Sequence, residues 1–181
     1  LDLGTGTGIL GILLCGKTDL SKIYGIEVQQ EVAEMAQRSI KLNNLENRFE
    51  IINKNIKDLE SVFDKNSFDF IITNPPYKKM DTGKTNENSK KLISRHEITA
   101  TLKDFIKISY IMLKDKGTLY MVHKPERLVD IIYQLRKNKI EPKEIRFVHP
   151  YEKKEPNLIL IKAVKNGGQF LKIDKPLYVY N

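Results

Sequence analysis

The sequence predicts an α/β fold, in which a mostly parallel sheet carries helices on both faces. Three observations predict it. Strand-like and helix-like stretches alternate along most of the 181-residue chain. Three alternating glycines, Gly4, Gly6 and Gly8, follow an apolar start and open a helix-like stretch. The apolar run 68–73 ends at two consecutive prolines, which cannot continue a central strand because they supply no ladder N–H.

The first half of the chain divides into two helices and three strands after its opening stub. Residues 9–15 are almost uniformly apolar and predict a buried helix that ends near Gly16. The second helix, 31–42, has an apolar stripe at helical spacing, formed by Val32, Met35, Ala36 and Ile40. The predicted strands are 22–27, 49–52 and 68–73.

The second half opens with a polar loop, 78–94, and continues with a helix at 98–113 and a strand at 117–123. Pro125 begins the next helix, at the position where proline is tolerated. The apolar stripes of the two helices are Leu102, Phe105, Ile106, Ser109 and Met112, then Leu128, Ile131, Ile132 and Leu135.

The last third predicts a different connection. Strands at 144–150 and 158–164 are separated by seven polar-loop residues, too few for a crossover helix, so we expect an antiparallel pair. Residues 169–180 are a candidate for a further terminal strand.

Composition favours a soluble globular protein, with 40% hydrophobic and 30% charged residues. The sequence contains no run of about 18 apolar residues, so it predicts no membrane-spanning helix. The one cysteine, Cys15, lies in an apolar helix, so an intrachain disulfide is excluded and cytoplasmic residence is expected. No Cys/His spacing predicts a metal site.

Charge is distributed unevenly along the chain. Residues 1–73 carry a formal net charge of −3, whereas residues 74–181 carry +11. A basic half of this kind favours a phosphate-rich partner such as nucleic acid. Solvated charge in a lysine-rich protein is the alternative interpretation.

The segment Asn74-Pro75-Pro76-Tyr77, called the proline turn below, follows a buried strand. Ligands of open α/β sheets bind at the carboxyl ends of the strands. The prolines fix φ near −65° and stiffen the backbone. A stiff turn that presents an amide, a carbonyl and an aromatic ring suits a flat group bearing an amine. A turn-forming Asn before Pro is the structural alternative.

Residues 4–8, called the glycine turn below, suit a backbone that approaches a ligand closely. Glu27 ends the next predicted strand, 19 residues after Gly8, where an acid commonly accepts hydrogen bonds from ribose hydroxyls. Residues 6–11 also fit the G-x-G-x-x-G dinucleotide fingerprint, so a nicotinamide-dependent dehydrogenase is a further interpretation, which leaves the proline turn unexplained.

Together, Asp2-x-Gly4-x-Gly6-x-Gly8 and the later Asn-Pro-Pro-Tyr resemble the Rossmann-like class I S-adenosylmethionine-dependent methyltransferases that act on planar amino groups. The resemblance runs from residue 1 to about 164. It implies a seven-stranded, mostly parallel sheet with an antiparallel C-terminal strand.

A narrower resemblance is to the bacterial "small domain" methyltransferases, whose members include tRNA1(Val) adenine-N6 methyltransferases acting beside the anticodon. It rests on Ser94-Arg95-His96-Glu97-Ile98, His123-Lys124-Pro125-Glu126-Arg127-Leu128, Phe147-Val148-His149-Pro150 and Pro156-Asn157-Leu158-Ile159-Leu160-Ile161. The resemblance implies an RNA substrate, with tRNA as the partner.

The resemblance also assigns roles. The S-adenosylmethionine site comprises Asp2, Gly4, Gly6, Gly8, Glu27, Val28, Asn55 and Ile56, with Asp58 as the alternative to Asn55. The catalytic residues are Asn74, Pro75 and Tyr77. The substrate contacts are Pro76, Arg95, His96, Lys124 and Arg127. No metal is implied.

The mechanism implied has two acceptors, the Asn74 side-chain oxygen and the Pro75 carbonyl, which bind the amino group and aim its lone pair at the methyl group. Tyr77 stacks on the base. The alternatives are release-factor glutamine methylation, ribosomal RNA or DNA amino methylation, and an RNA-binding module that has lost catalysis.

We expect residues 1–181 to form a single methyltransferase domain. Only three residues precede the glycines, whereas a strand usually has five or six, and the chain lacks an initiator Met. We therefore expect a piece of a longer protein that is truncated within its first strand. Its oligomeric state is left open.

Overall fold

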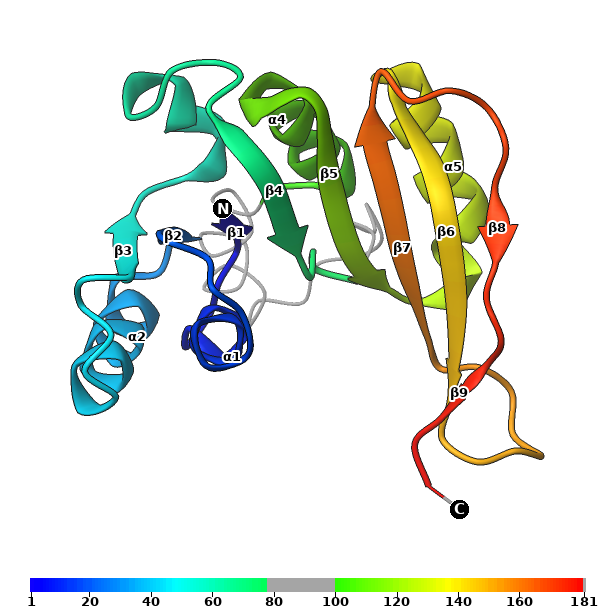
Figure 1. Ribbon diagram of the computed structural model, residues 1–181, viewed down its shortest axis with the longest axis horizontal. Coiled ribbons are helices and arrows are strands. Elements are labelled where there is room, and N and C mark those ends of the chain that lie inside the picture. The colour runs from blue at the N-terminus through cyan, green and yellow to red at the C-terminus, as the bar shows by residue number, and fades with distance from the viewer. Residues whose placement is uncertain (78–99, 181) are drawn as a thin grey trace, which may run out of the picture.

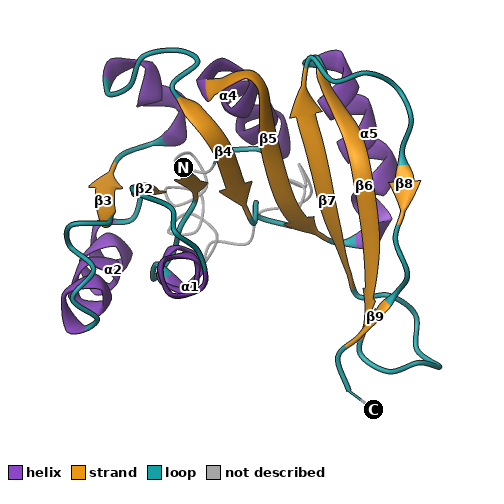
Figure 2. Cartoon of the chain, viewed as in Figure 1, coloured by secondary structure: helices purple, strands orange, loops and turns teal. Residues whose placement is uncertain are grey.

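The computed structural model describes residues 1–77 and 100–180 as an α/β fold built on one nine-stranded sheet (Figures 1 and 2). The strands are β1 Asp2–Leu3, β2 Ile23–Glu27, β3 Phe49–Asn53, β4 Phe68–Thr73, β5 Leu113–His123, β6 Ile140–His149, β7 Leu158–Lys165, β8 Lys172–Ile173 and β9 Leu177–Tyr178. The helices are α1 Ile9–Lys17, α2 Gln30–Leu42, α4 Leu102–Met112 and α5 Leu128–Lys137, with short 3₁₀ helices at Ile56–Ser61 and Pro125–Arg127.

The strand order is β3-β2-β1-β4-β5-β7-β6-β8, and β9 also pairs with β6. Strands β1 to β5 pair in parallel, and β7 runs antiparallel to both of its neighbours. The order reverses at β1, which has β2 on one side and β4 on the other. Such a switch point opens a crevice at the carboxyl ends of the strands.

The predicted α/β fold with its antiparallel final pair is confirmed, but the strand count is wrong. Within the described residues nine strands form instead of seven, because the stretch 169–180, a candidate for one terminal strand, adds β8 and β9, each two residues long and parallel to β6. The predicted polar loop 78–94 lies outside the described residues. Helix α4 begins only at Leu102, where Thr101 and Asp104 form a capping box.

Helices α4 and α5 cover one face of the sheet, and α1 and α2 pack near β2 and β3 (Figure 1). The predicted stripe of α4 is fully buried. The stripe of α2 is shifted: Ala33, Ala36 and Ile40 are buried, whereas Met35 is 45% exposed.

The expectation that α1 is a buried helix is wrong. Only Gly11 and Cys15 are buried, and Ile9 and Leu13 are about half exposed. The reason is that, within the described residues, α1 is packed on one side by the β2–β3 cluster around Phe49 and has an open flank toward β4 (Figure 1). An apolar run does not reveal how many sides a helix has covered.

The described helices hold no stretch that is long and apolar enough to span a bilayer. Across residues 1–77 and 100–180, no cluster of three or more His, Cys, Asp or Glu side chains has the arrangement of a metal site.

Candidate active site

A cavity of about 220 Å³ lies at the carboxyl edge of the sheet, next to the switch point. It brings together segments that are far apart in sequence: the glycine turn, the end of β2, the start of the 3₁₀ helix after β3, and the proline turn. The lining residues are Gly4, Ile26, Glu27, Val28, Gln29, Asn55, Ile56, Asn74, Pro76, Ala100 and Phe105. Two sets of predicted site residues, one for cofactor and one for substrate, thus share one cavity.

The glycine turn has a backbone that favours glycine. Gly4, Gly6 and Gly8 have φ values of 71°, 57° and 83°, in the left-handed region that L side chains rarely adopt. The turn is fixed by backbone hydrogen bonds from Thr5 N–H to Ile26 O (2.9 Å) and from Gly8 N–H to Thr5 O (3.0 Å). A ligand could therefore approach this backbone without meeting a Cβ.

Glu27 ends β2 and is 7% exposed. One carboxylate oxygen accepts from the Gly6 N–H at 3.1 Å and the other from the Gln29 N–H at 2.9 Å. The side chain is therefore held in place by two backbone donors from opposite sides. A carboxylate oxygen can accept more than one hydrogen bond, so capacity for ribose hydroxyls is left at the cavity wall.

Asp2 lies in β1, buried beneath the glycine turn. One of its oxygens accepts a hydrogen bond from Thr5 Oγ1 at 2.6 Å, and the other, Oδ1, is buried without a hydrogen-bond partner within the described part of the chain. Burial raises the pKa of Asp2 to about 6, although the Thr5 hydroxyl opposes the shift. An unmatched buried acceptor fits a cationic ammonium group, such as that of a methionine moiety.

Asn55 caps the 3₁₀ helix after β3, and its side-chain oxygen accepts from the Lys57 N–H at 3.0 Å. Asn55 and the buried Ile56 line the cavity, where an adenine ring could lie between polar and apolar surface. Asp58 is exposed and does not line it. The geometry therefore favours Asn55 over Asp58.

The proline turn follows β4, which is anchored by the Thr73 hydroxyl bonding to Leu3 O at 2.9 Å. Pro75 is buried, and Asn74 and Pro76 face the cavity. Among the described residues, none forms a hydrogen bond with the Asn74 side chain. The amide is therefore available to a ligand.

Tyr77 packs edge-on against His123 at the end of β5, with ring centroids 5.2 Å apart and planes at 64°. The Lys124 Nζ lies 5.5 Å from the Tyr77 ring centroid. Arg127 instead forms an ion pair with Asp130 (2.8 Å) at the start of α5. Lys124 is thus close to the proline turn, whereas Arg127 is paired with Asp130 of α5. The other two predicted substrate contacts, Arg95 and His96, lie outside the described residues.

His123 is a residue to which sequence reasoning assigned no role. It is fully buried, and its Nδ1 accepts the Lys124 N–H at 2.8 Å, so the proton of the neutral ring is on Nε2. That nitrogen is buried without a partner in the described part of the chain. Burial lowers the pKa of His123, and the charge of Arg127 adds to the effect. The sequence signal that could have identified His123 as a site residue is its position at the end of β5, the strand beside β4.

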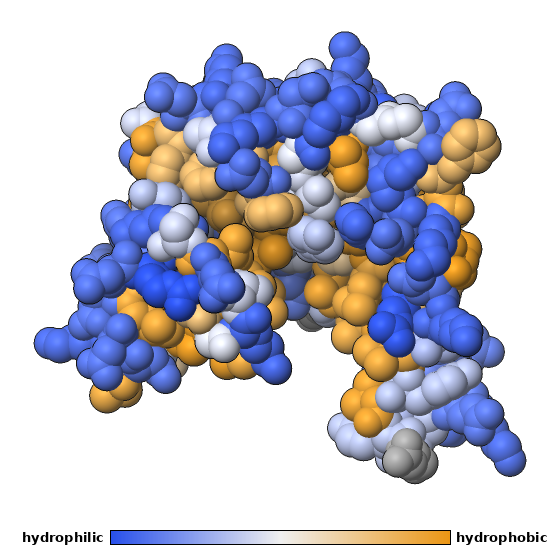
Figure 3. Space-filling model, in the orientation of Figure 1, coloured by the Kyte–Doolittle hydropathy of each residue, from blue (hydrophilic) through white to orange (hydrophobic). Residues whose placement is uncertain are grey.

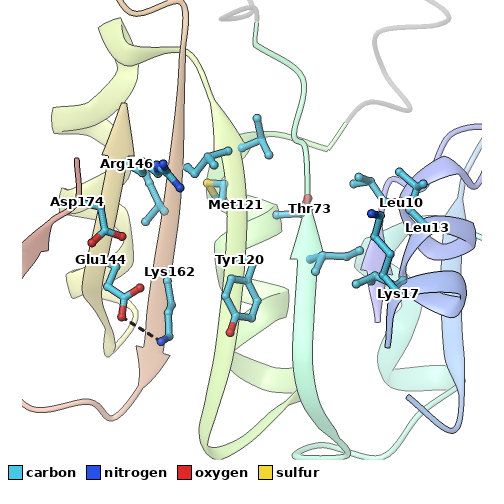
Figure 4. A pocket seen from close by; sticks show the side chains of 15 residues that line it. Leu10, Leu13, Lys17, Thr73, Tyr120, Met121, Glu144, Arg146, Lys162 and Asp174 are labelled. Atoms are coloured by element: carbon cyan, nitrogen blue, oxygen red, sulfur yellow. Dashed lines mark hydrogen bonds and ion pairs between the residues drawn. The ribbon is translucent and has the colours of Figure 1, made fainter. Parts of the chain in front are cut away.

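A larger cavity, of about 420 Å³, lies on the face of the sheet instead of its edge (Figure 4). It lies between α1 and the exposed faces of β4, β5, β7 and β6, and an ion pair between Lys162 and Glu144 (3.1 Å) borders it. Figure 3 shows apolar residues gathered around the hollow on this face. Its lining is chiefly aliphatic and holds none of the predicted site residues, so the smaller edge cavity is the candidate active site.

The family model described as "Methyltransferase small domain" matches residues 1–136, which include every described segment of the edge cavity. The chain belongs to this family. This membership makes the chain an S-adenosylmethionine-dependent methyltransferase domain, the class predicted from the glycine and proline turns.

Curated relatives carry a more specific name. The chain is 28% identical over 162 residues to a tRNA1(Val) (adenine(37)-N6)-methyltransferase of Porphyromonas gingivalis, covering 88% of this chain and 63% of that protein. It is 27% identical over 163 residues to the enzyme of the same name from Parabacteroides distasonis, covering 90% and 67%. The chain thus spans about two thirds of the length of these relatives.

Solved structures share the fold. A predicted O-methyltransferase from Agrobacterium tumefaciens has a TM-score of 0.79 at 22% identity, covering 99% of this chain and 79% of that one. A geranyl diphosphate C-methyltransferase from Streptomyces coelicolor, solved with S-adenosyl-L-homocysteine, has a TM-score of 0.65 at 13% identity, covering 91% and 69%. At these identities the likeness supports the architecture alone.

Proposed function

We propose that the protein to which this chain belongs transfers a methyl group from S-adenosylmethionine to the exocyclic N6 amino group of an adenine in tRNA. The observation that carries the proposal is the edge cavity, in which Glu27 and Asn55 share one space with Asn74 and Pro76. The first pair would hold the cofactor and the second pair would hold the amine, so the two reactants would meet in one cavity. The names of the curated relatives support adenine in tRNA as the substrate.

The cofactor end is formed by groups that match the parts of S-adenosylmethionine. Glu27 accepts the ribose hydroxyls, Asn55 and Ile56 flank the adenine, and Val28 lies at the cavity wall beside Glu27. Gly4 lines the cavity without a side chain, and Gly6 and Gly8 provide the left-handed backbone of the turn; Asp2 Oδ1, buried beneath this turn, would accept from the ammonium group directly or through water. When bound, the cofactor supplies an electrophilic methyl group on a positively charged sulfur.

The substrate end acts on the amino nitrogen. Its lone pair is shared with the aromatic ring, so the amine is a poor nucleophile. The Asn74 oxygen and the Pro75 carbonyl each accept one N–H, which favours a pyramidal nitrogen whose lone pair points at the methyl group. Tyr77 stacks on the base, and its ring is held in place by His123 and Lys124. The N–C bond would form as the methyl–sulfur bond breaks, and the cationic nitrogen would then release one proton to solvent. No strong base is therefore needed, and positioning supplies most of the rate.

The test uses the full-length protein with methyl-labelled S-adenosylmethionine, offered total tRNA and, separately, release factor. Label recovered from tRNA as N6-methyladenosine is the expected result. Label in release factor alone replaces the proposal with glutamine methylation, which uses the same planar-amine chemistry. Label in neither leaves ribosomal RNA, DNA or a non-catalytic RNA-binding module.

Asn74→Ala tests the assigned mechanism. We expect kcat to fall by about a hundredfold or more, because one of two positioning hydrogen bonds is lost at the reacting nitrogen. Cofactor affinity, measured by calorimetry, stays within about twofold. Asn47→Ala, a change at an exposed Asn before β3, is the matched control and leaves both values unchanged. Equal loss of cofactor affinity and turnover in Asn74→Ala contradicts the assignment.

A further inference from the structure

Three exposed tyrosines gather where β6 meets the chain's tail. Tyr151, Tyr178 and Tyr180 are 48%, 44% and 58% exposed. The Tyr151 and Tyr180 rings lie 5.3 Å apart with planes at 34°, and Tyr178 lies 5.5 Å from the ring of His149. We call these four residues the tyrosine edge. Exposed aromatic rings of this number on one surface require an explanation, since water does not favour them.

The rings are held by regular backbone structure. Strand β9 pairs in parallel with the end of β6, with Tyr178 opposite His149. Two further backbone bonds, Val179 N–H to His149 O (3.0 Å) and Tyr180 N–H to Pro150 O (2.9 Å), continue this attachment to the tail. The surface is therefore preorganised, and a ligand that stacks on it needs to order little of the protein.

The tyrosine edge and the active site share one edge of the sheet. Strands β5 and β6 both run toward it, because each is antiparallel to β7 between them. At this edge β7 lies between β5 and β6, with Ile159 opposite both His123 and Phe147. With strands about 4.8 Å apart, three steps from β5 to β9 amount to about 15 Å across the sheet, and Tyr178 lies opposite His149, two residues beyond the level of His123.

Lys124 connects the two sites. Its Nζ lies over the Tyr77 ring and also donates to Asn157 O at 3.3 Å, in the loop that carries Tyr151. That loop closes on β6 through Asn157 N–H to Val148 O (2.9 Å). A nucleotide strand that leaves the Tyr77 ring toward the tyrosine edge would therefore pass Lys124 before it reaches the tyrosines.

Charge identifies the class of partner less strongly than the rings do. Exposed lysines Lys153, Lys154 and Lys175 flank the tyrosines, but Glu152 and Glu155 nearly balance them. The phosphate backbone of a duplex would therefore gain little binding free energy from these nearly balanced charges. Unstacked bases would gain more, because every base has a face that can stack on tyrosine.

We propose that the tyrosine edge binds unpaired nucleotides that flank the methylated adenine, by stacking their bases on Tyr151, Tyr178 and Tyr180. The inference rests on the proposed function, because it places the same RNA on a second part of the protein. It assigns the surface to looped or single-stranded RNA, the form in which bases are accessible.

The test uses the full-length protein and a fluorescent single-stranded RNA containing one adenine, with binding measured by anisotropy. The double variant Tyr151→Leu/Tyr180→Leu keeps apolar packing in the tail but removes the stacking faces. We expect its RNA Kd to rise at least about tenfold, since each stacked base contributes about 1–3 kcal/mol. Tyr151→Phe/Tyr180→Phe keeps the rings and retains binding within about twofold.

Tyr133→Leu is the matched control: Tyr133 is 59% exposed on α5 and has a lysine 5.7 Å over its ring, but it lies away from the edge. It leaves the RNA Kd unchanged. Thermal unfolding and cofactor affinity show whether the tail stays folded in every variant. Wild-type RNA affinity in the Leu double variant overturns the proposal. An equal loss of RNA affinity in the Leu and Phe double variants also overturns it, because the effect then belongs to the hydroxyls and not to the rings.

The two proposals fail in different ways. RNA binding that depends on the rings, with methyl transfer only to release factor, keeps the tyrosine edge and rejects the proposed substrate. Methyl transfer to tRNA with unchanged binding in the Leu double variant keeps the proposed substrate and rejects the edge. No binding of RNA by the wild-type protein rejects the edge outright.

Discussion

At the scale of single residues, Asp2 and His123 each bury a polar atom without a hydrogen-bond partner in the described part of the chain. Such atoms are costly in a folded protein and are commonly retained at functional sites. Asp2 lies under the glycine turn, and His123 contacts the edge of Tyr77. One unmatched acceptor therefore lies next to the predicted cofactor residues, and one unmatched donor lies next to the proline turn.

The raised pKa of Asp2 predicts a specific pH dependence of stability. The folded protein holds the Asp2 proton up to about pH 6, whereas the unfolded chain releases it near 3.8. Asp2 therefore lowers stability progressively as pH rises from about 4 to 6, and the full cost remains above that range. Asp2→Asn cannot ionise and lacks this component.

We expect the free energy of unfolding of Asp2→Asn, relative to wild type, to increase by about 2 kcal/mol between pH 4 and pH 7. Urea denaturation at a series of pH values measures it. Asp19→Asn, at an exposed aspartate before β2, is the control for the substitution itself. A difference for Asp2→Asn that is independent of pH shows that the carboxyl is ionised normally in the folded protein.

At the scale of elements, α1 is held against the sheet by a glycine. A Cβ on Gly11 would lie 2.3 Å from the ring of Phe49, which is itself only 1% exposed. The ring has no room to retreat, so the absence of a side chain sets how closely α1 approaches β3. Gly16, in the last turn of the same helix, has open space at its Cβ position.

The two glycines predict opposite effects of the same substitution. Gly16→Ala stabilises the protein by up to about 1 kcal/mol, because alanine is the better helix former. Gly11→Ala destabilises it by about 1–3 kcal/mol, because the added methyl group overpacks a filled core. Denaturant unfolding of both variants measures the difference. A neutral or stabilising Gly11→Ala means that α1 is not packed on Phe49 as described.

At the scale of the whole molecule, charge and chemistry are divided between the two halves of the chain. Residues 1–73, with net charge −3, supply the predicted cofactor contacts, and residues 74–181, with +11, supply the proline turn and the tyrosine edge. Both halves meet at one edge of the sheet. A basic half that faces RNA releases counterions on binding, so affinity for RNA depends on salt.

We expect the RNA Kd of the full-length protein to rise about tenfold to twentyfold between 50 and 200 mM salt, as for about three neutralised phosphates on a single strand. Cofactor affinity changes little over this range, because the cofactor is not a polyanion. Anisotropy for RNA and calorimetry for cofactor provide the two measurements. An RNA Kd that is insensitive to salt assigns the excess lysines to solvated surface.

The sequence alone predicted the elements with local signals. Strand β4 was predicted with its observed bounds, because an apolar run meets two prolines. The buried stripe of α4 was predicted because its periodicity is strong. The parallel sheet with an antiparallel final pair followed from loop lengths, since seven residues cannot form a crossover helix. The family followed from two short motifs whose chemistry depends on residue type.

Only the tertiary structure decided which residues meet. It placed His123 against the edge of Tyr77, brought Asn55 but not Asp58 to the cavity wall, and held Arg127 in an ion pair. It also exposed half of α1 and paired the tail with β6, which created the tyrosine edge. Periodicity and motifs report on neighbours along the chain, whereas burial, pKa and contact depend on strands that are brought together from distant positions.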